Sequence, residues 1–173
     1  MLPLSTILND LDIDKVKSNL KSFQCQNDND IQDFLINKSI EFEKRRKSRT
    51  YLLINNNFEI LAYFTLALKV LKLSDNISKS SRKKLDGFKN DIKEIPYYLI
   101  GQLERNDNFT NNTISGKTIL SYAIRIIRQS YEQIGGKIVL VECNDNHKVI
   151  PFYLNNGFKL LQKDELVQLI LHL

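Results

Sequence analysis

The sequence predicts an α/β domain built on one mixed sheet, and three observations support this fold class. The chain has 173 residues and 42% hydrophobic content, enough for one core of ordinary size. Segments with helical periodicity alternate with short β-rich segments along the chain. The sequence shows no linker, repeat or low-complexity tract, so we expect a single domain over residues 1–173.

Composition excludes several other classes. The 25 Lys and Arg residues exceed the 20 Asp and Glu residues by five, a mildly basic balance that is compatible with an acidic ligand without establishing a nucleic-acid partner. No apolar run approaches the roughly 18 residues of a membrane span. The N-terminus lacks the features of a signal peptide, and the two cysteines form no CxxC motif. We therefore expect a cytoplasmic protein with reduced thiols and no membrane association.

Five elements are expected in the first part of the chain. In order, they are a strand over Ile7–Leu11, helices over Ile13–Phe23 and about 29–46, and strands over Thr50–Ile54 and Phe58–Leu68. Apolar residues three and four apart indicate the two helices, and several N-cap candidates precede the second. Three asparagines between the two later strands tolerate a left-handed backbone, which predicts a hairpin.

A polar stretch, Lys69–Ile95, is expected to be a helical or irregular excursion that Pro96 ends. The later elements are a strand over Tyr97–Leu103, a loop over Glu104–Thr113, a helix over Gly116–Gln133, a strand over Lys137–Cys143, a short helix that ends at Gly157, and strands over Phe158–Leu161 and Leu166–Leu171. A broad apolar stripe indicates the long helix, and Gly135-Gly136 suits a left-handed C-terminal cap. The short helix should begin near Lys148, because Pro151 is tolerated only in a first turn.

The loop before the long helix is a candidate phosphate site. It consists of Asn111, Asn112, Thr113, Ile114, Ser115, Gly116 and Lys117. A helix N-terminus offers free N–H groups and the positive end of the helix dipole, and the glycine and lysine suit an anion. The loop is not a P-loop, because the first glycine of that motif is absent. The alternative is a helix start whose glycine serves packing.

The second half carries a pattern of Asn, six residues, Tyr, three residues and Gly-Phe. This pattern resembles the fourth-helix motif of the GNAT N-acetyltransferases. The matching residues are Asn146, Tyr153, Gly157 and Phe158, with Lys137–Cys143 as the preceding strand, Leu99–Leu103 as the cofactor-pairing strand, and Asn111, Ile114 and Gly116 in the pyrophosphate loop. The N-terminal half resembles a subgroup with toxin-like members through FQC at 23–25, IQDFL at 31–35, TYLL at 50–53 and YFTLA at 63–67. The resemblance implies a single, mostly antiparallel mixed sheet flanked by helices.

The resemblance also implies an activity: transfer of an acetyl group from acetyl-CoA to an amine. The acceptor would be a small molecule, a protein or an aminoacyl-tRNA. The strand ending at Leu103 would pair with the cofactor, and the 111–117 loop would hold its pyrophosphate. Tyr153, with an ordinary pKa near 10, would be the general acid, the alternative being a core tyrosine. Asn146 would bind the cofactor or cap a helix, and Glu104 would be a base or a solvated carboxylate.

Departures from the family pattern motivate an alternative function. Asn111 replaces a Gln or Arg, and Ile114 replaces a glycine, so a non-catalytic acyl-CoA-binding protein of the same fold stays open, as does a scaffold protein without a CoA site. The basic clusters at 44–49 and 79–84 are either solvated or a patch for RNA or another polyanion. The isolated His147 and His172 predict no metal site. The oligomeric state is open, a homodimer included.

Overall fold

The computed structural model describes residues 1–26, 28–109 and 114–173. These residues form one seven-stranded sheet with the order β1-β2-β3-β4-β5-β7-β6. The β4–β5 pair is parallel, whereas the β1–β2, β2–β3, β5–β7 and β6–β7 pairs are antiparallel. The predicted fold class, a mixed, mostly antiparallel sheet with flanking helices, is therefore confirmed.

The elements have the following bounds. The strands are β1 Leu2–Pro3, β2 Arg49–Ile54, β3 Ile60–Lys72, β4 Glu94–Arg105, β5 Ile138–Cys143, β6 Lys159–Lys163 and β7 Val167–His172. The helices are α1 Leu4–Asp10, α2 Ile13–Lys21, α3 Asn29–Asp33, the π-helical segment η1 Phe34–Lys38, α4 Ser39–Lys44, α5 Lys79–Asp86, α6 Gly116–Ile134 and α7 Val149–Asn155. No helix in the described ranges has the length and apolar character needed to cross a bilayer.

The chain divides into two compact units, each made of two stretches of sequence. The first contains Met1–Ala67 and Gly101–Ala123, and the second contains Leu68–Ile100 and Ile124–Leu173. The prediction of a single domain over residues 1–173 stays a prediction.

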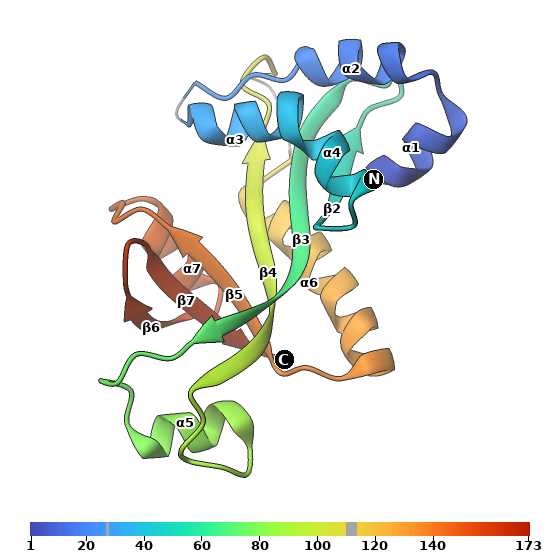
Figure 1. Cartoon of the computed structure of the whole chain (residues 1–173). Coiled ribbons are helices and arrows are strands. Elements are labelled where there is room, and N and C mark those ends of the chain that lie inside the picture. The colour runs from blue at the N-terminus through green and yellow to red at the C-terminus, as the bar shows by residue number, and fades with distance from the viewer. Residues whose placement is uncertain (27, 110–113) are drawn as a thin grey trace. The chain divides into compact units, whose positions relative to one another are not determined.

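The first unit has its core between the N-terminal helices and the β2–β3 hairpin (Figure 1). Leu52 and Tyr63 are paired across the hairpin and point to the same face of the sheet. Tyr63 packs edge-on against Phe23, with ring centroids 5.1 Å apart, and its hydroxyl donates to the carbonyl of Ile31 at 2.5 Å. The buried polar tip of Tyr63 is therefore satisfied while its ring supports the core.

The predicted strand over Ile7–Leu11 is wrong, because these residues belong largely to helix α1. Leu4 is completely buried, and Ile7 and Leu8 pack against the same core. The spacing of three and four residues places these side chains on one helical face. A short apolar run does not by itself distinguish a strand from a helix, and packing decides between them.

The predicted hairpin is confirmed, but its second strand begins at Ile60. The side-chain oxygen of Asn55 accepts hydrogen bonds from the N–H groups of Asn57 at 2.9 Å and Glu59 at 3.0 Å. This side chain therefore closes the turn locally, as asparagine commonly does. Phe58, expected in the strand, lies in the turn with a φ of 62°.

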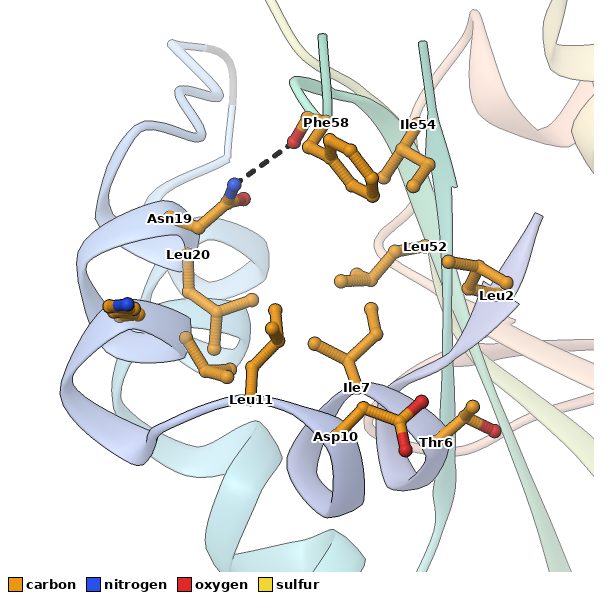
Figure 2. Close-up of a pocket in the computed structure, with 12 residues that line it drawn as sticks. Leu2, Thr6, Ile7, Asp10, Leu11, Asn19, Leu20, Leu52, Ile54 and Phe58 are labelled. Atoms are coloured by element: carbon orange, nitrogen blue, oxygen red, sulfur yellow. Dashed lines mark hydrogen bonds between the residues drawn. The ribbon is translucent and has the colours of Figure 1, made fainter. Parts of the chain in front are cut away.

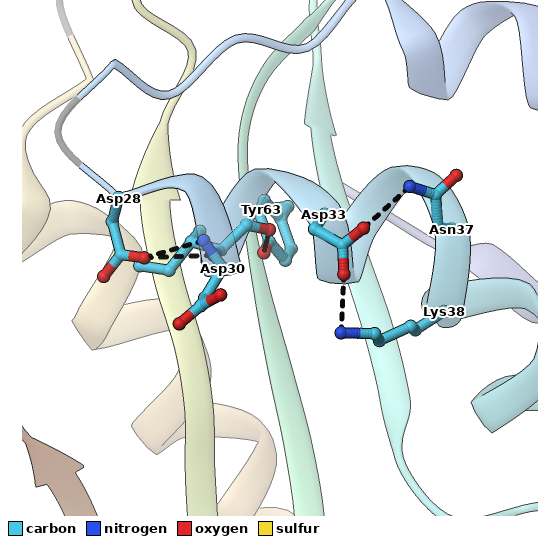
Figure 3. A network of polar contacts seen from close by, with 7 residues as sticks. Asp28, Asp30, Asp33, Asn37, Lys38 and Tyr63 are labelled. Carbon is cyan, nitrogen blue, oxygen red and sulfur yellow. Dashed lines mark hydrogen bonds and ion pairs between the residues drawn. The ribbon is translucent and has the colours of Figure 1, made fainter.

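The predicted helix over about 29–46 is present, although it is not uniform: α3, η1 and α4 follow one another without a break. Asp28 caps its start, because its carboxylate accepts the N–H groups of Asp30 at 3.0 Å and Ile31 at 3.2 Å (Figure 3).

In the second unit, the predicted strand over Lys137–Cys143 is present as β5, and its residues Ile138–Val141 are buried. The predicted left-handed cap of α6 is also present, with φ values of 77° at Gly135 and 100° at Gly136. The Tyr98 hydroxyl donates to the carbonyl of Gly135 at 2.5 Å. A Cβ atom at Gly136 would lie 2.8 Å from the ring of Tyr98, so both backbone conformation and space require glycine there.

The predicted polar excursion contains α5 and is shorter than expected, because β3 extends to Lys72 and β4 begins at Glu94, before Pro96. Arg82, only 8% exposed, holds this segment together. Its guanidinium donates to the carbonyls of Ile77 at 3.0 Å, Ser74 at 2.8 Å, and Ile92. Arg82 is therefore a structural residue, and the exposed basic residues of the 79–84 cluster are its lysines.

Candidate functional site

The N-terminus of α6 lies where the sequence predicts a phosphate site. Ser115 caps this helix: its hydroxyl accepts the N–H of Thr118 and its carbonyl accepts the N–H of Ile119, both at 3.1 Å. Within the part of the chain that the structure describes, no residue accepts a hydrogen bond from the N–H groups of Gly116 or Lys117. These two donors stand at the positive end of a 19-residue helix, so the arrangement suits an anion.

Part of the predicted loop lies outside the described residues, namely Asn111, Asn112 and Thr113. Of the described part, Ile114 is half-buried and Ser115 is exposed. The assignment of residues 111–117 to a cofactor site stays a prediction.

The parallel ladder between β4 and β5 is short. It joins Tyr98 to Val139 and ends where Ile100 faces Val141. Strand β5 continues to Cys143, paired there with β7. The predicted cofactor strand, Leu99–Leu103, therefore extends beyond the last residue of the ladder, and its role as a cofactor edge stays a prediction.

Tyr153 lies in α7 and is 8% exposed. Its ring meets two other aromatic rings edge-on, with centroids 5.0 Å from Phe152 and 5.3 Å from Phe158. Edge-to-face contacts of this kind restrain the ring and therefore the direction of its hydroxyl. A buried, restrained tyrosine fits both of the predicted roles, the general acid and the core residue.

Asn146 lies in the turn before α7. Its side-chain oxygen accepts the N–H of Lys148 at 2.8 Å and, more weakly, that of Val149 at 3.4 Å. Asn146 therefore has a local role in the turn before α7, and a contact of Asn146 with a cofactor stays a prediction. The expected start of α7 near Lys148 is confirmed. Pro151 therefore falls in the first turn of the helix, where its lack of an N–H group costs no hydrogen bond.

Glu104 is the penultimate residue of β4 and is half-buried. Burial raises the pKa of its carboxyl group, and the nearby Asp107 raises it further. The N–H of Arg105 donates to the carboxylate at 2.9 Å and partly opposes this shift. A carboxylate with a raised pKa is a better candidate for a general base than a fully solvated one.

We expect Glu104→Gln to raise the free energy of unfolding at pH 7, because burial penalises the ionised carboxylate in the folded state. The folded-state pKa lies above the unfolded value, so the wild type loses stability as pH rises between the two values. The gain of the variant should therefore vanish at pH values below the ordinary pKa of glutamate. Urea denaturation at pH 7 and below pH 4 measures both effects.

Glu94→Gln provides the control for this prediction, because Glu94 is an exposed carboxylate on the same strand. It should show no pH-dependent gain. If the two variants behaved alike, the environment of Glu104 would not be the cause.

Sequence reasoning missed the role of Asn106, which it placed in a polar loop. Asn106 is 2% exposed, and its side-chain oxygen accepts the N–H groups of Gln24 and Asn108, both at 3.1 Å. Its amide group donates to the carbonyl of Ile60 at 2.7 Å. One side chain thus joins the exit of β4 to two distant segments. The local run Asn-Asp-Asn indicates a turn, but it does not indicate these partners.

The structure offers no alternative chemistry at the histidines or cysteines. In residues 1–26, 28–109 and 114–173, no three His, Cys, Asp or Glu side chains are placed to hold a metal ion. Cys25 is buried, and burial raises the pKa of the half-buried Cys143 thiol. A raised pKa lowers the thiolate fraction, which argues against Cys143 as a nucleophile.

The first unit also contains an apolar pocket of about 330 Å³ (Figure 2). Side chains of Ile7, Leu11 and Leu52 point into it from α1, the turn after α1, and β2. At one end, the side-chain amide of Asn19 donates to the carbonyl of Phe58 at 2.9 Å. The mostly apolar lining of this pocket suits an apolar group rather than a phosphate.

No protein-family model matches the sequence, and no match was found among curated proteins. Solved structures do match. The AtaT structure "complexed with acetyl-methionyl-tRNAfMet" has a TM-score of 0.72 and 23% identity, over 88% of this chain and 86% of that one. A tyrosine-to-phenylalanine mutant of KacT has a TM-score of 0.72 and 20% identity over the same shares. A structure described only as a bacterial toxin has a TM-score of 0.71 and 16% identity, over 89% of this chain and 83% of that one.

The chain therefore has the GNAT fold. Within that fold it is similar to toxins such as AtaT, which confirms the predicted resemblance at the level of the fold.

Proposed function

We propose that the chain is an acetyl-CoA-dependent N-acetyltransferase that acts on the amino group of an aminoacyl-tRNA. The observation that supports this most strongly is the fold that it shares with AtaT over 88% of its length. AtaT has been solved with acetyl-methionyl-tRNAfMet and, together with AtaR, with acetyl-CoA. Small amines and proteins are the other acceptor classes compatible with the chemistry.

The residues at the start of α6 suit the pyrophosphate of acetyl-CoA. The N–H groups of Gly116 and Lys117 are unused by other described residues and would hold the pyrophosphate, with the exposed Lys117 side chain adding charge. Backbone donors do not depend on side-chain identity, so Ile114 can replace a glycine without removing an N–H group. The pantetheine arm would pair with the part of β4 that follows Ile100, where the β4–β5 ladder ends.

The proposed reaction is a direct transfer. The neutral amine attacks the thioester carbon, a C–N bond forms, and the C–S bond breaks. Tyr153 would donate its hydroxyl proton to the departing thiolate and regain a proton from solvent. Glu104, or a water molecule, would take the proton that the amine loses. Tyr153 would thus give up a proton from its phenolic oxygen, and Glu104 would accept one on a carboxylate oxygen.

Acetyl-CoA affinity tests the proposed cofactor site through Gly116→Asp. The new carboxylate would stand beside the pyrophosphate, and at an effective dielectric near 20 two like charges about 4 Å apart repel by about 4 kcal/mol. We therefore expect at least a tenfold loss of affinity, measured by calorimetry. Gly116 does not have a positive φ and lies in the first turn of α6, where aspartate favours the helix, so folding should not suffer.

Ser121→Asp is the matched control, because it adds the same charge to an exposed position five residues further along α6. It should leave affinity nearly unchanged. Equal affinities in the wild type and Gly116→Asp would place the pyrophosphate elsewhere.

The alternative function, acyl-CoA binding without catalysis, is motivated by Asn111 and Ile114. It predicts acetyl-CoA binding in the absence of thiol release with any aminoacyl-tRNA or small amine. A protein partner is also proposed, since AtaT has been solved bound to the C-terminus of the antitoxin AtaR. A homodimer stays a prediction.

A further inference from the structure

The first unit contains a second concave surface, a groove of about 350 Å³ between α2 and the η1–α4 segment. Its lining residues are Ile13, Lys17, Lys21, Ile36, Asn37, Ile40, Glu41 and Lys44. Three isoleucines form an apolar part of the lining, and three lysines approach it from two helices. The basic clusters identified in the sequence include Lys44 but not Lys17 or Lys21 of α2.

The positive charge of this groove is not neutralised within the described residues. Lys17, Lys21 and Lys44 are exposed, and no carboxylate in the described ranges forms an ion pair with any of them. Glu41, the one acidic residue of the lining, pairs with Arg45. Lys17 and Lys21 are four residues apart on one helical face, where like charges destabilise a helix. An anion in the groove would remove this cost.

An uncommon backbone feature lines the same groove. Ile36 and Asn37 belong to η1, where the N–H of Ser39 bonds to the carbonyl of Phe34, five residues earlier. The carboxylate of Asp33 does not compete for the groove lysines, because Asn37 donates to it at 2.8 Å and Lys38 at 2.5 Å (Figure 3). Single π-helical turns are rare and often mark functional sites.

A strained residue follows the groove in sequence. Arg46 has a φ of 57° at the end of α4, where the N–H of Lys47 bonds to the carbonyl of Phe42 at 2.9 Å. Glycine is usual at such a left-handed helix end, because residues with a Cβ atom are strained there. The chain thus has a cation two residues after Lys44, at a position where glycine would be more stable.

We propose that this groove binds the phosphate backbone of RNA through Lys17, Lys21 and Lys44. The choice of RNA rests on the proposed aminoacyl-tRNA acceptor, whereas the preference for a polyanion rests on the charges alone. Lysine binds phosphate as a point charge and needs no paired geometry. Three such charges distributed over two helices suit the successive phosphates of a chain better than a single small anion.

The test measures binding of deacylated bulk tRNA by fluorescence anisotropy at several salt concentrations. The variant is Lys17→Gln/Lys21→Gln/Lys44→Gln. Each phosphate contact contributes a slope of about 0.7 to 0.9 in a plot of log affinity against log salt, so losing three should reduce the slope by about two to three. The control, Lys69→Gln/Lys72→Gln/Lys93→Gln, removes three exposed lysines that form no ion pair in the described ranges.

A smaller slope in the groove variant, with the control unchanged, supports the proposal. Equal slopes in the two variants, or a flat salt response of the wild type, overturn it. Binding of polyglutamate without binding of tRNA also overturns it and assigns the groove to an acidic polypeptide. Acetyl-CoA affinity is measured on the same samples. If the wild type binds acetyl-CoA but the groove variant does not change the salt slope, only the groove proposal fails. If the wild type binds no acetyl-CoA, the proposed function itself fails.

Discussion

Tyr153→Phe should lower the turnover of acetyl transfer by on the order of 100-fold while leaving the affinity for acetyl-CoA nearly unchanged. The substitution keeps the ring, and therefore the edge-on contacts with Phe152 and Phe158. It removes only the hydroxyl, the donor that would protonate the thiolate as the C–S bond breaks. Steady-state kinetics with an aminoacyl-tRNA acceptor, together with calorimetry for acetyl-CoA, separates the two quantities.

Tyr131→Phe is the matched control, because it removes a hydroxyl from a half-buried tyrosine on α6 without altering the aromatic cluster. Its turnover should equal that of the wild type. Normal turnover with weakened binding in Tyr153→Phe would mean that the hydroxyl only positions the cofactor. Structures of tyrosine-to-phenylalanine mutants of both AtaT and KacT have been solved, so this type of replacement is compatible with the fold.

Asn106→Ala should lower the free energy of unfolding by about 3 kcal/mol, because three backbone groups lose their partner at once. These groups are the N–H of Gln24, the N–H of Asn108 and the carbonyl of Ile60. A buried polar group left without a partner costs about 1–3 kcal/mol. Urea denaturation measures the loss directly.

Asn108→Ala is the control for this second prediction. The side chain of Asn108 also makes a long-range bond, to the carbonyl of Ser22 at 2.8 Å, but it is exposed. Water can replace that bond, so the loss should stay below about 1 kcal/mol. Similar losses in the two variants would show that water enters the Asn106 site as well.

The elements that were predicted correctly are those with a strong local pattern. The apolar stripe of α6, the continuous apolar run of β5 and the asparagines of the β2–β3 turn each reflect interactions between residues close in sequence. Local hydrogen bonds and periodic burial determine such elements, and they are readable without knowing the partner. Residues 4–11 show where prediction from local pattern fails. An apolar segment of about two turns fits a helix or a strand, and only the surface that it covers decides between them.

The features of the candidate site also fall into those that the local sequence indicates and those that only the fold determines. The motif containing Asn146 and Tyr153 and the capped start of α6 are visible in the sequence, because caps, glycines and spacing are local features. The pKa shift of Glu104 is not visible there, because burial causes it and burial depends on the whole first unit.

The sequence by itself determined the alternation of elements, the helix caps and the GNAT-like motifs. Only the tertiary structure decided which polar groups are buried and which charges converge. Arg82 looked like part of a surface cluster, yet it is buried among carbonyls up to ten residues away. Lys17 and Lys44 are 27 positions apart in the chain and line one groove. Convergence of this kind depends on how helices pack, and packing is set by side chains distant in sequence, which no local pattern encodes.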